Sequence, residues 1–136
     1  MPAEKILVVD DEQSMTQFLG IVLRKEGYQV TVCNNGRDAL EKVRAEGFDV
    51  VITDLRMPGM DGIALLEGVK KHDPTLPVVI MTAYASQQTA IDAVNLGAFQ
   101  YLIKNAKTDE IKLVVRNAVE MRRVRRENQY LKRELK

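Results

Sequence analysis

Short apolar runs alternate with longer segments of helical period along most of the chain. Five runs have the length of strands, and they lie near residues 5–9, 29–33, 49–53, 77–82 and 99–103. The segments between them repeat apolar residues three and four positions apart. This alternation predicts βα units, and therefore an α/β fold in which helices cover both faces of a doubly wound, five-stranded parallel sheet.

The composition of each run indicates its place in the sheet. The runs that contain Ile6, Val50 and Val78 are continuously apolar, as strands covered on both faces are. The run 29–33 instead alternates polar and apolar residues, which is typical of a strand at the edge of a sheet. We therefore expect three central strands and an edge formed by residues 29–33.

The helical segments carry apolar stripes, which predict that each helix is buried on one side. The stripes consist of Phe18, Leu19, Val22 and Leu23; Ala39, Leu40 and Val43; Ile63, Leu65, Leu66 and Val69; and Ala90, Ile91 and Val94. Gly27 follows the first helix at the position of a C-terminal cap, and Asp61 is the predicted N-cap of the third.

The last helix is predicted to begin near Thr108, and no helix-breaking residue follows before Lys136. At ~1.5 Å per residue it would be about 40 Å long, so its second half must leave a body of this size. Part of it follows the 3-4 spacing of a coiled-coil seam, formed by Val114, Asn117, Met121, Val124, Asn128, Leu131 and Leu135. An asparagine at position 128 favours a parallel, two-stranded coil. The predicted division is a domain of residues 1–119 and a helical coiled-coil linker of residues 120–136.

Length and charge agree with this division. A chain of 136 residues is long enough for one domain. Residues 1–119 hold 13 lysines and arginines against 16 aspartates and glutamates, whereas residues 120–136 hold 7 against 3. No stretch is suited to span a membrane and the start lacks a secretory signal, so we expect a cytoplasmic protein. With Cys33 as the only cysteine, no intrachain disulfide forms.

The basic run of residues 122–126 has the charge of a nucleic-acid-binding segment. However, Glu120, Glu127 and Glu134 are spaced by seven residues, which fits the flanking charges of a coiled coil better. We therefore predict that this chain makes no direct contact with nucleic acid.

Polar residues stand where four of the five predicted strands end. Asp10 and Asp11 follow the first run, Asp54 follows the third, Thr82 ends the fourth, and Lys104 follows the fifth. The carboxyl ends of parallel strands meet at one edge of a sheet, where open α/β folds bind their ligands. Three carboxylates, a hydroxyl and an ammonium group are thus predicted to share one pocket, which indicates a site for a divalent metal and phosphoryl transfer.

The predicted metal is Mg²⁺, because clustered carboxylates repel one another unless a cation joins them and Mg²⁺ prefers oxygen ligands. We expect Asp11, Asp54 and the backbone carbonyl of Arg56 to bind it, with Asp10 holding a metal-bound water.

The remaining carboxylate oxygen of Asp54 is a candidate nucleophile for attack on phosphorus. Lys104 and Thr82 would then stabilise the oxygens of the transferred group. The product would be an acyl phosphate, whose lability suits a reversible signal.

Four segments together resemble the receiver domain of two-component response regulators. They are residues 9–12, 54–62, 81–83 and 97–104, with the sequences VDDE, DLRMPGMDG, MTA and GAFQYLIK. The resemblance covers residues 4 to about 119. It implies the strand order 2-1-3-4-5 and a phosphoprotein that receives its phosphoryl group on Asp54 from a histidine kinase. A receiver is not an enzyme beyond its own phosphorylation and dephosphorylation.

The resemblance also implies a switch. Phosphate would draw Thr82 inward and let Tyr101 turn into the space it leaves, which repacks the face made by the fourth helix, the fifth strand and the fifth helix. A homodimer is expected to use this face together with the coiled coil. Arg56 and Tyr84 would border the phosphate and tune its hydrolysis by water.

The tail resembles the linker helix that follows the receiver in sigma-54-dependent transcriptional activators of the nitrogen regulatory protein C type. In those proteins the linker leads to an AAA+ ATPase and then to a DNA-binding domain. Neither module is present in this sequence, so we expect a fragment of a longer transcription regulator.

One position departs from the receiver pattern. Receivers usually follow the lysine with proline, often through a cis peptide, whereas Lys104 is followed by Asn105. A cis peptide before a residue other than proline costs about 3 kcal/mol or more, so we predict a trans peptide and a reshaped loop.

Two functions of other classes stay open. A phosphatase or phosphotransferase with an aspartyl-phosphate intermediate commonly has a second acid two residues after its nucleophile, and this chain has Arg56 there. A stand-alone coiled-coil scaffold would have no use for three crowded carboxylates.

Overall fold

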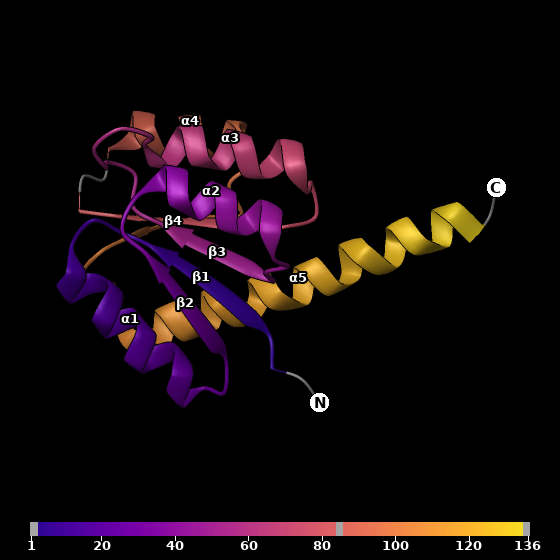
Figure 1. Ribbon diagram of the computed structural model, residues 1–136, viewed down its shortest axis with the longest axis horizontal. Coiled ribbons are helices and arrows are strands. Elements are labelled where there is room, and N and C mark those ends of the chain that lie inside the picture. The colour runs from indigo at the N-terminus through magenta and orange to yellow at the C-terminus, as the bar shows by residue number, and fades with distance from the viewer. Residues whose placement is uncertain (1–2, 84–85, 135–136) are drawn as a thin grey trace.

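Strands and helices alternate along the whole chain (Figure 1). The computed structural model describes residues 3–83 and 86–134. The elements are β1 (Lys5–Val9), α1 (Gln13–Lys25), β2 (Gln29–Cys33), α2 (Gly36–Ala45), β3 (Val50–Thr53), α3 (Gly62–His72), β4 (Val78–Thr82), α4 (Gln87–Asn95), β5 (Gln100–Ile103) and α5 (Thr108–Glu134). Every predicted strand is confirmed, with bounds that agree to within one residue.

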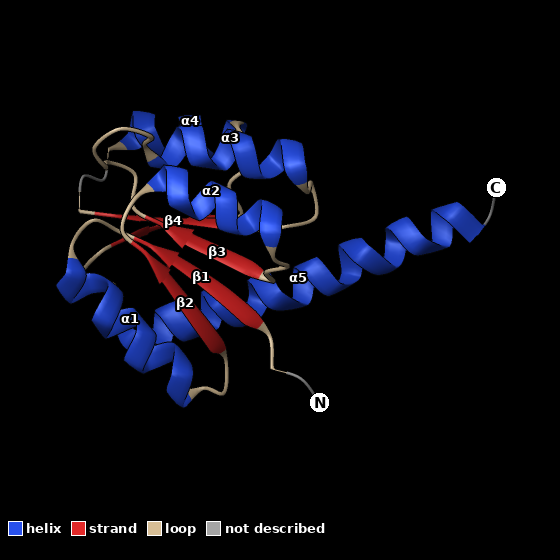
Figure 2. Cartoon of the chain, in the orientation of Figure 1, coloured by secondary structure: helices blue, strands red, loops and turns tan. Residues whose placement is uncertain are grey.

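The strands form one parallel sheet in the order β2-β1-β3-β4-β5, which confirms the predicted topology. Helices α2, α3 and α4 cover one face of the sheet, and α1 and α5 cover the other (Figure 2). Strand β2 lies at an edge, as its alternating sequence predicts.

The sheet divides the core into two clusters. In β1, Ile6 and Val8 belong to the cluster that includes residues of α1 and α5, whereas Leu7 and Val9 belong to the cluster that includes residues of α2 and α3. Successive side chains of a strand point to opposite faces, so a strand covered on both faces must be apolar at every position. This is why the central strands have continuously apolar sequences.

Two of the predicted helix stripes are wrong in part. In α1 the buried face includes Leu19 and Leu23, and Phe18 lies outside it and is exposed. In α4, Ile91 and Val94 are 44% and 58% exposed, whereas Ala93 is fully buried. Helix α4 has apolar residues on two faces, and the face with the small side chain is the one that packs against the body.

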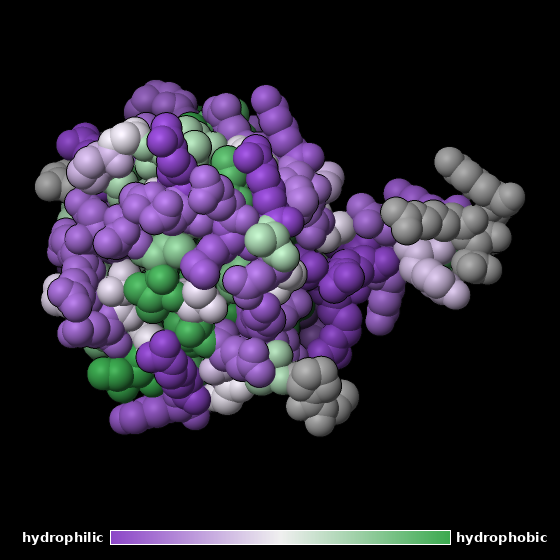
Figure 3. Space-filling view, viewed as in Figure 1, coloured by the Kyte–Doolittle hydropathy of each residue, from purple (hydrophilic) through white to green (hydrophobic). Residues whose placement is uncertain are grey.

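Helix α5 runs beyond the amino ends of the strands, which confirms that its second half leaves the body (Figure 1). Val114 was predicted to be part of the coiled-coil seam. It is instead buried in the core with Ile111 and Ala118, so it cannot contact a second helix there. The exposed part of the apolar seam starts at Met121, and the projecting half is mostly hydrophilic on the side seen in Figure 3. Leu135 lies outside the described residues. None of the described helices has both the length and the apolar character needed to cross a membrane.

The predicted turns and caps are found. Gly27 has a φ of 94°, a left-handed conformation that favours glycine, where α1 ends. Asp61 accepts a hydrogen bond from the Ala64 N–H at 2.8 Å, as the N-cap of α3. Asn35 caps α2 in the same way, which was not predicted. No peptide bond of the described chain is cis, so Lys104 precedes Asn105 through a trans peptide as predicted.

We predict that Gly62→Ala destabilises the domain by about 1–3 kcal/mol, which is typical of an overpacked core. A Cβ at this position would meet the backbone carbonyl of Asp54 and lie 2.9 Å from the Cα of Leu55. This clash outweighs the ~0.5–1 kcal/mol that alanine gains over glycine in a helix. Gly47→Ala is the control, because a Cβ at Gly47 meets nothing within 4 Å. Urea unfolding of both variants tests this, and equal midpoints would contradict it.

Candidate functional site

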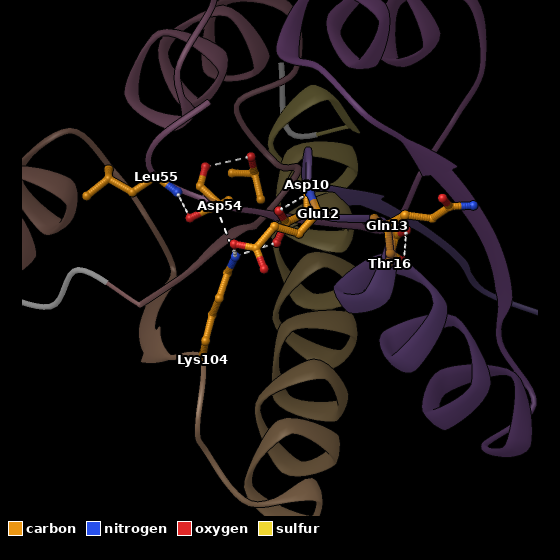
Figure 4. Close-up of polar contacts among 8 residues, drawn as sticks. Asp10, Glu12, Gln13, Thr16, Asp54, Leu55 and Lys104 are labelled. Carbon is orange, nitrogen blue, oxygen red and sulfur yellow. Dashed lines mark hydrogen bonds and ion pairs between the residues drawn. The ribbon is translucent and has the colours of Figure 1, made fainter. Parts of the chain in front are cut away.

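Asp54 follows the carboxyl end of β3, and its buried side chain is directed towards Lys104 in a group of polar residues that we call the pocket (Figure 4). Its N–H donates to the carbonyl of Val9 at 3.0 Å, which extends the pairing of β3 with β1 by one residue. Its Oδ1 accepts a hydrogen bond from the Leu55 N–H at 2.7 Å. The other carboxylate oxygen, Oδ2, points to the centre of the pocket.

Asp10 enters the same pocket from the end of β1 and is also buried. Its N–H donates to the carbonyl of Cys33 at 3.1 Å, and its Oδ1 accepts from the Glu12 N–H at 2.9 Å. Burial raises the pKa of the Asp10 carboxyl above its ordinary value, although a hydrogen bond from Lys104 partly offsets this. A cation beside Asp10 therefore favours its ionised form against the effect of burial.

Lys104 supplies positive charge at the centre of the pocket (Figure 4). Its N–H donates to the carbonyl of Thr82 at 2.9 Å, next to the end of β5. Its Nζ lies 2.8 Å from Oδ2 of Asp10, 3.1 Å from Oδ2 of Asp54 and 3.3 Å from Oε1 of Glu12. Burial alone would lower the pKa of this ammonium, but the hydrogen bonds to Asp10 and Asp54 raise it above its ordinary value. The trans peptide to Asn105 thus leaves Lys104 able to reach the pocket.

Comparison with known proteins decides the family. The model of the response regulator receiver domain matches residues 6–116. The chain belongs to the response regulator receiver family. The receiver is similar to the transcriptional regulatory protein ZraR of Escherichia coli K12, with 47% identity over 114 residues that cover 84% of this chain and 26% of that protein. It thus spans about a quarter of the length of the curated relatives that it matches.

Solved structures agree with this assignment. NtrX of Brucella abortus superposes with a TM-score of 0.89 and 32% identity, over 96% of this receiver and 30% of that chain. The beryllofluoride-activated receiver domain dimer of NtrC4 superposes with a TM-score of 0.83 and 32% identity, over 87% of this receiver and 98% of that chain.

Three carboxylates of the receiver are arranged as potential metal ligands. Among the described residues, Asp10, Glu12 and Asp54 each place an oxygen within 4.8 Å of the others, and this acidic cluster is typical of the Mg²⁺ site of receivers. Glu12 was missed as a site residue. It is the N-cap of α1 but makes no capping hydrogen bond with its side chain, so its carboxylate can turn towards Lys104. Asp11 is exposed and outside this group, and its role as a metal ligand stays a prediction.

The other predicted residues lie around the pocket. Thr82 is fully buried at the end of β4. Tyr101 is half-buried in β5 and packs against the core on the side of α2 and α3. Arg56 is exposed in the loop that follows Asp54. Tyr84 lies outside the described residues.

We predict that Lys104→Met lowers the free energy of unfolding by about 3 kcal/mol at neutral pH without metal, the usual scale for removing one partner of a buried ion pair. The change removes the ion pairs of Lys104 and leaves the carboxylates of Asp10 and Asp54 buried without them. Lys107→Met is the control, because Lys107 is exposed in the same loop. Urea unfolding in the presence of a chelator measures both. If the two variants had equal midpoints, the ion pairs of Lys104 would not stabilise the receiver.

Proposed function

We propose that this receiver takes a phosphoryl group on Asp54 from a histidine kinase, with Mg²⁺, and passes the signal to an attached transcriptional output. The observation that carries the proposal is the buried carboxylate of Asp54, held at the edge of the sheet beside Lys104 and two further carboxylates. Carboxylates act as nucleophiles on phosphorus when a cation neutralises the charge around them.

The donor set fits Mg²⁺, because it consists of three carboxylate oxygens that lie within 4.8 Å of one another. Asp54 would hold the ion with Asp10 and Glu12, or with Asp11 as the sequence predicts, and with the backbone carbonyl of Arg56. The bound ion would neutralise charge on the phosphoryl oxygens. The ion would not remove the need for Lys104, because a phosphoryl dianion together with the carboxylates of Asp10 and Glu12 has more negative charge than one divalent ion balances.

Lys104 has a defined part in the transfer. Its ammonium now bonds to the same Oδ2 of Asp54 that points into the pocket. When Oδ2 becomes the bridging oxygen of an acyl phosphate it loses its negative charge, so the ammonium is expected to move to a phosphoryl oxygen. Thr82 would donate its hydroxyl to another oxygen of the group. Arg56 and Tyr84 are proposed to control access of the water that hydrolyses the product.

The proposed output of the switch is a homodimer formed by the face of α4, β5 and α5. Large apolar side chains are exposed there: Ile91, Val94, Leu96, Ile103 and Leu113. The beryllofluoride-activated receiver domain of NtrC4, which shares this fold, is a dimer, and this supports dimerisation as the response of this receiver. Tyr101 lies in β5 within this region and is the proposed link between Thr82 and the dimer face.

The proposed downstream function is transcription from sigma-54 promoters, through AAA+ and DNA-binding domains that follow in a longer chain. The curated relatives are transcription regulators about four times as long as the matched segment. Met121, Val124 and Leu131 are exposed along the projecting half of α5, which suits a coiled-coil linker to such domains.

Replacing Asp54 by asparagine is expected to abolish labelling by a small phosphodonor such as acetyl phosphate. The asparagine keeps the size of the side chain and loses the nucleophilic oxygen. Asp61→Asn is a matched control on the same loop, because asparagine also caps helices and Asp61 lies outside the carboxylate cluster. Mass spectrometry of the intact protein measures the added phosphoryl group. Label retained by Asp54→Asn would overturn the assignment.

A glutamate at Leu113 is expected to prevent a change of mass when the protein binds Mg²⁺ and beryllofluoride. Leu113 is 52% exposed on α5, and a charge there would have to be buried in the proposed dimer. Ile21→Glu is the control, because Ile21 is 57% exposed on α1, outside the proposed face. Sedimentation equilibrium is measured for the parent and both variants.

The expected result is a change in mass for the parent and Ile21→Glu, and none for Leu113→Glu. A parent that is dimeric throughout would show instead that the coiled coil fixes the oligomer. Equal responses of the two variants would contradict the choice of face.

A further inference from the structure

Arg122 is buried at the point where α5 leaves the body. Its residue exposure is 6%, although it belongs to the basic run of residues 122–126, whose charge is typical of a solvent-exposed segment. Its Nη1 donates to Oδ2 of Asp73 at 3.3 Å, and its Nε lies 3.4 Å from Oδ1 of Asp49. Arg123, the next residue along the helix, is exposed and pairs only loosely with Glu120 at 3.7 Å.

Both carboxylates that hold Arg122 are themselves fixed. Oδ2 of Asp49 accepts from the backbone N–H of Lys5 at 2.8 Å. Oδ1 of Asp73 accepts from the N–H and the hydroxyl of Thr75 at 3.0 and 2.6 Å. Each acid therefore uses one oxygen to hold its own loop and offers the other to the guanidinium group. The pKa of Asp73 is lowered despite its partial burial, because Thr75 and Arg122 favour the ionised form.

The two acids lie near the amino ends of two strands. Asp49 directly precedes β3, which leads to Asp54 at its other end, and Asp73 is the C-cap of α3, in front of the loop that leads to β4 and Thr82. Arg122 is therefore joined to the start of β3 and to the end of α3.

Apolar packing alone does not extend as far as Arg122. In the described chain, Val119 is the last residue of α5 that packs against either core cluster. The segment 123–134 that follows has about three turns, and isolated helices of this length are only marginally stable in water. Among the described residues, Arg122 forms the last ion pairs between α5 and the body.

The ion pair is better suited to fix geometry than to add stability. The pKa of Arg122 is lowered, chiefly because burial disfavours its charged form, and the opposing effect of Asp73 and Asp49 offsets only part of this desolvation cost. The guanidinium donates a hydrogen bond from Nη1 to Asp73, and its Nε, which makes no hydrogen bond among the described residues, forms an ion pair with Asp49. Two acids on opposite parts of one planar group restrain its orientation, whereas a flexible ammonium has no fixed arrangement of donors.

We propose that Arg122 is a positioning residue that, with Asp49 and Asp73, fixes the direction in which residues 123–134 leave the receiver. Any domain attached to the end of α5 then has one orientation relative to the phosphorylation pocket. The proposal concerns the resting protein and does not depend on phosphorylation.

The test is the set of residual dipolar couplings of backbone N–H groups in a neutral aligning medium. The proteins are the parent, Arg122→Met, Arg122→Lys and the control Arg123→Met, at a concentration where all sediment with the same mass. In the parent and in Arg123→Met, one alignment tensor should fit both the strands and residues 123–132. In Arg122→Met the couplings of residues 123–132 should fall at least twofold, while those of the strands stay unchanged.

In Arg122→Lys the couplings of residues 123–132 should fall by an intermediate amount. The ammonium keeps the positive charge but does not pair with Asp49 and Asp73 at the same time. The proposal would be overturned if the couplings of the parent required separate tensors for the strands and for residues 123–132. It would also be overturned if one tensor fitted the couplings of Arg122→Met as well as it fits those of the parent. If Arg122→Met does not fold, Asp49→Asn replaces it, since the amide oxygen still accepts from the Lys5 N–H and only the charge facing Arg122 is lost. No phosphodonor enters this experiment, so its result is separate from that of the labelling experiment.

Discussion

The site depends on the ion pairs that the ammonium of Lys104 forms with three carboxylates. Its Nζ lies within 3.3 Å of oxygens from Asp10, Glu12 and Asp54, and two of these carboxylates are buried. Without a cation between them the buried carboxylates would repel in a region of low dielectric. The groups come from the ends of β1, β3 and β5, so they meet only when the strands stand in register in one parallel sheet. The chemistry of the pocket therefore requires this order and register of the strands.

The opposite edge of the sheet repeats this arrangement with a different cation. At the pocket a lysine joins Asp10 and Asp54, and where α5 leaves the body Arg122 joins Asp49 and Asp73. A lysine has a flexible stem and a compact charge, so it can exchange one oxygen for another when a ligand arrives. An arginine holds its partners in a fixed plane. The chemistry of each edge therefore matches its proposed use, with exchange at the pocket and fixed geometry at the exit of α5.

The sequence predicts the sheet and most of the pocket because both depend on local patterns. Continuous apolar runs require strands covered on two faces, and Asp54 and Lys104 follow such runs directly. Glu12 was missed because its place in the pocket depends on how the chain turns into α1. The role of Arg122 was not predicted for a similar reason: its partners, Asp49 and Asp73, are 73 and 49 residues away in the sequence. The spacing of polar and apolar residues along α5 does not reveal contacts with residues so distant in the sequence.

The exposed face of α4 was also mispredicted, and the reason bears on the switch. Burying Ile91 and Val94 would each contribute roughly 1.5–3 kcal/mol, yet the buried side chain is that of Ala93. A helix that packs through a small residue buries little apolar surface, so it gains little free energy from one particular placement on the sheet. Moving it therefore costs less than moving α3, which buries Leu65, Leu66 and Val69. If Asp54 is phosphorylated as proposed, the energy released by the new contacts would be limited to a few charge-assisted hydrogen bonds. An element held this weakly is one that such a limited energy can move, and its large apolar side chains are already at the surface, where a second molecule can cover them.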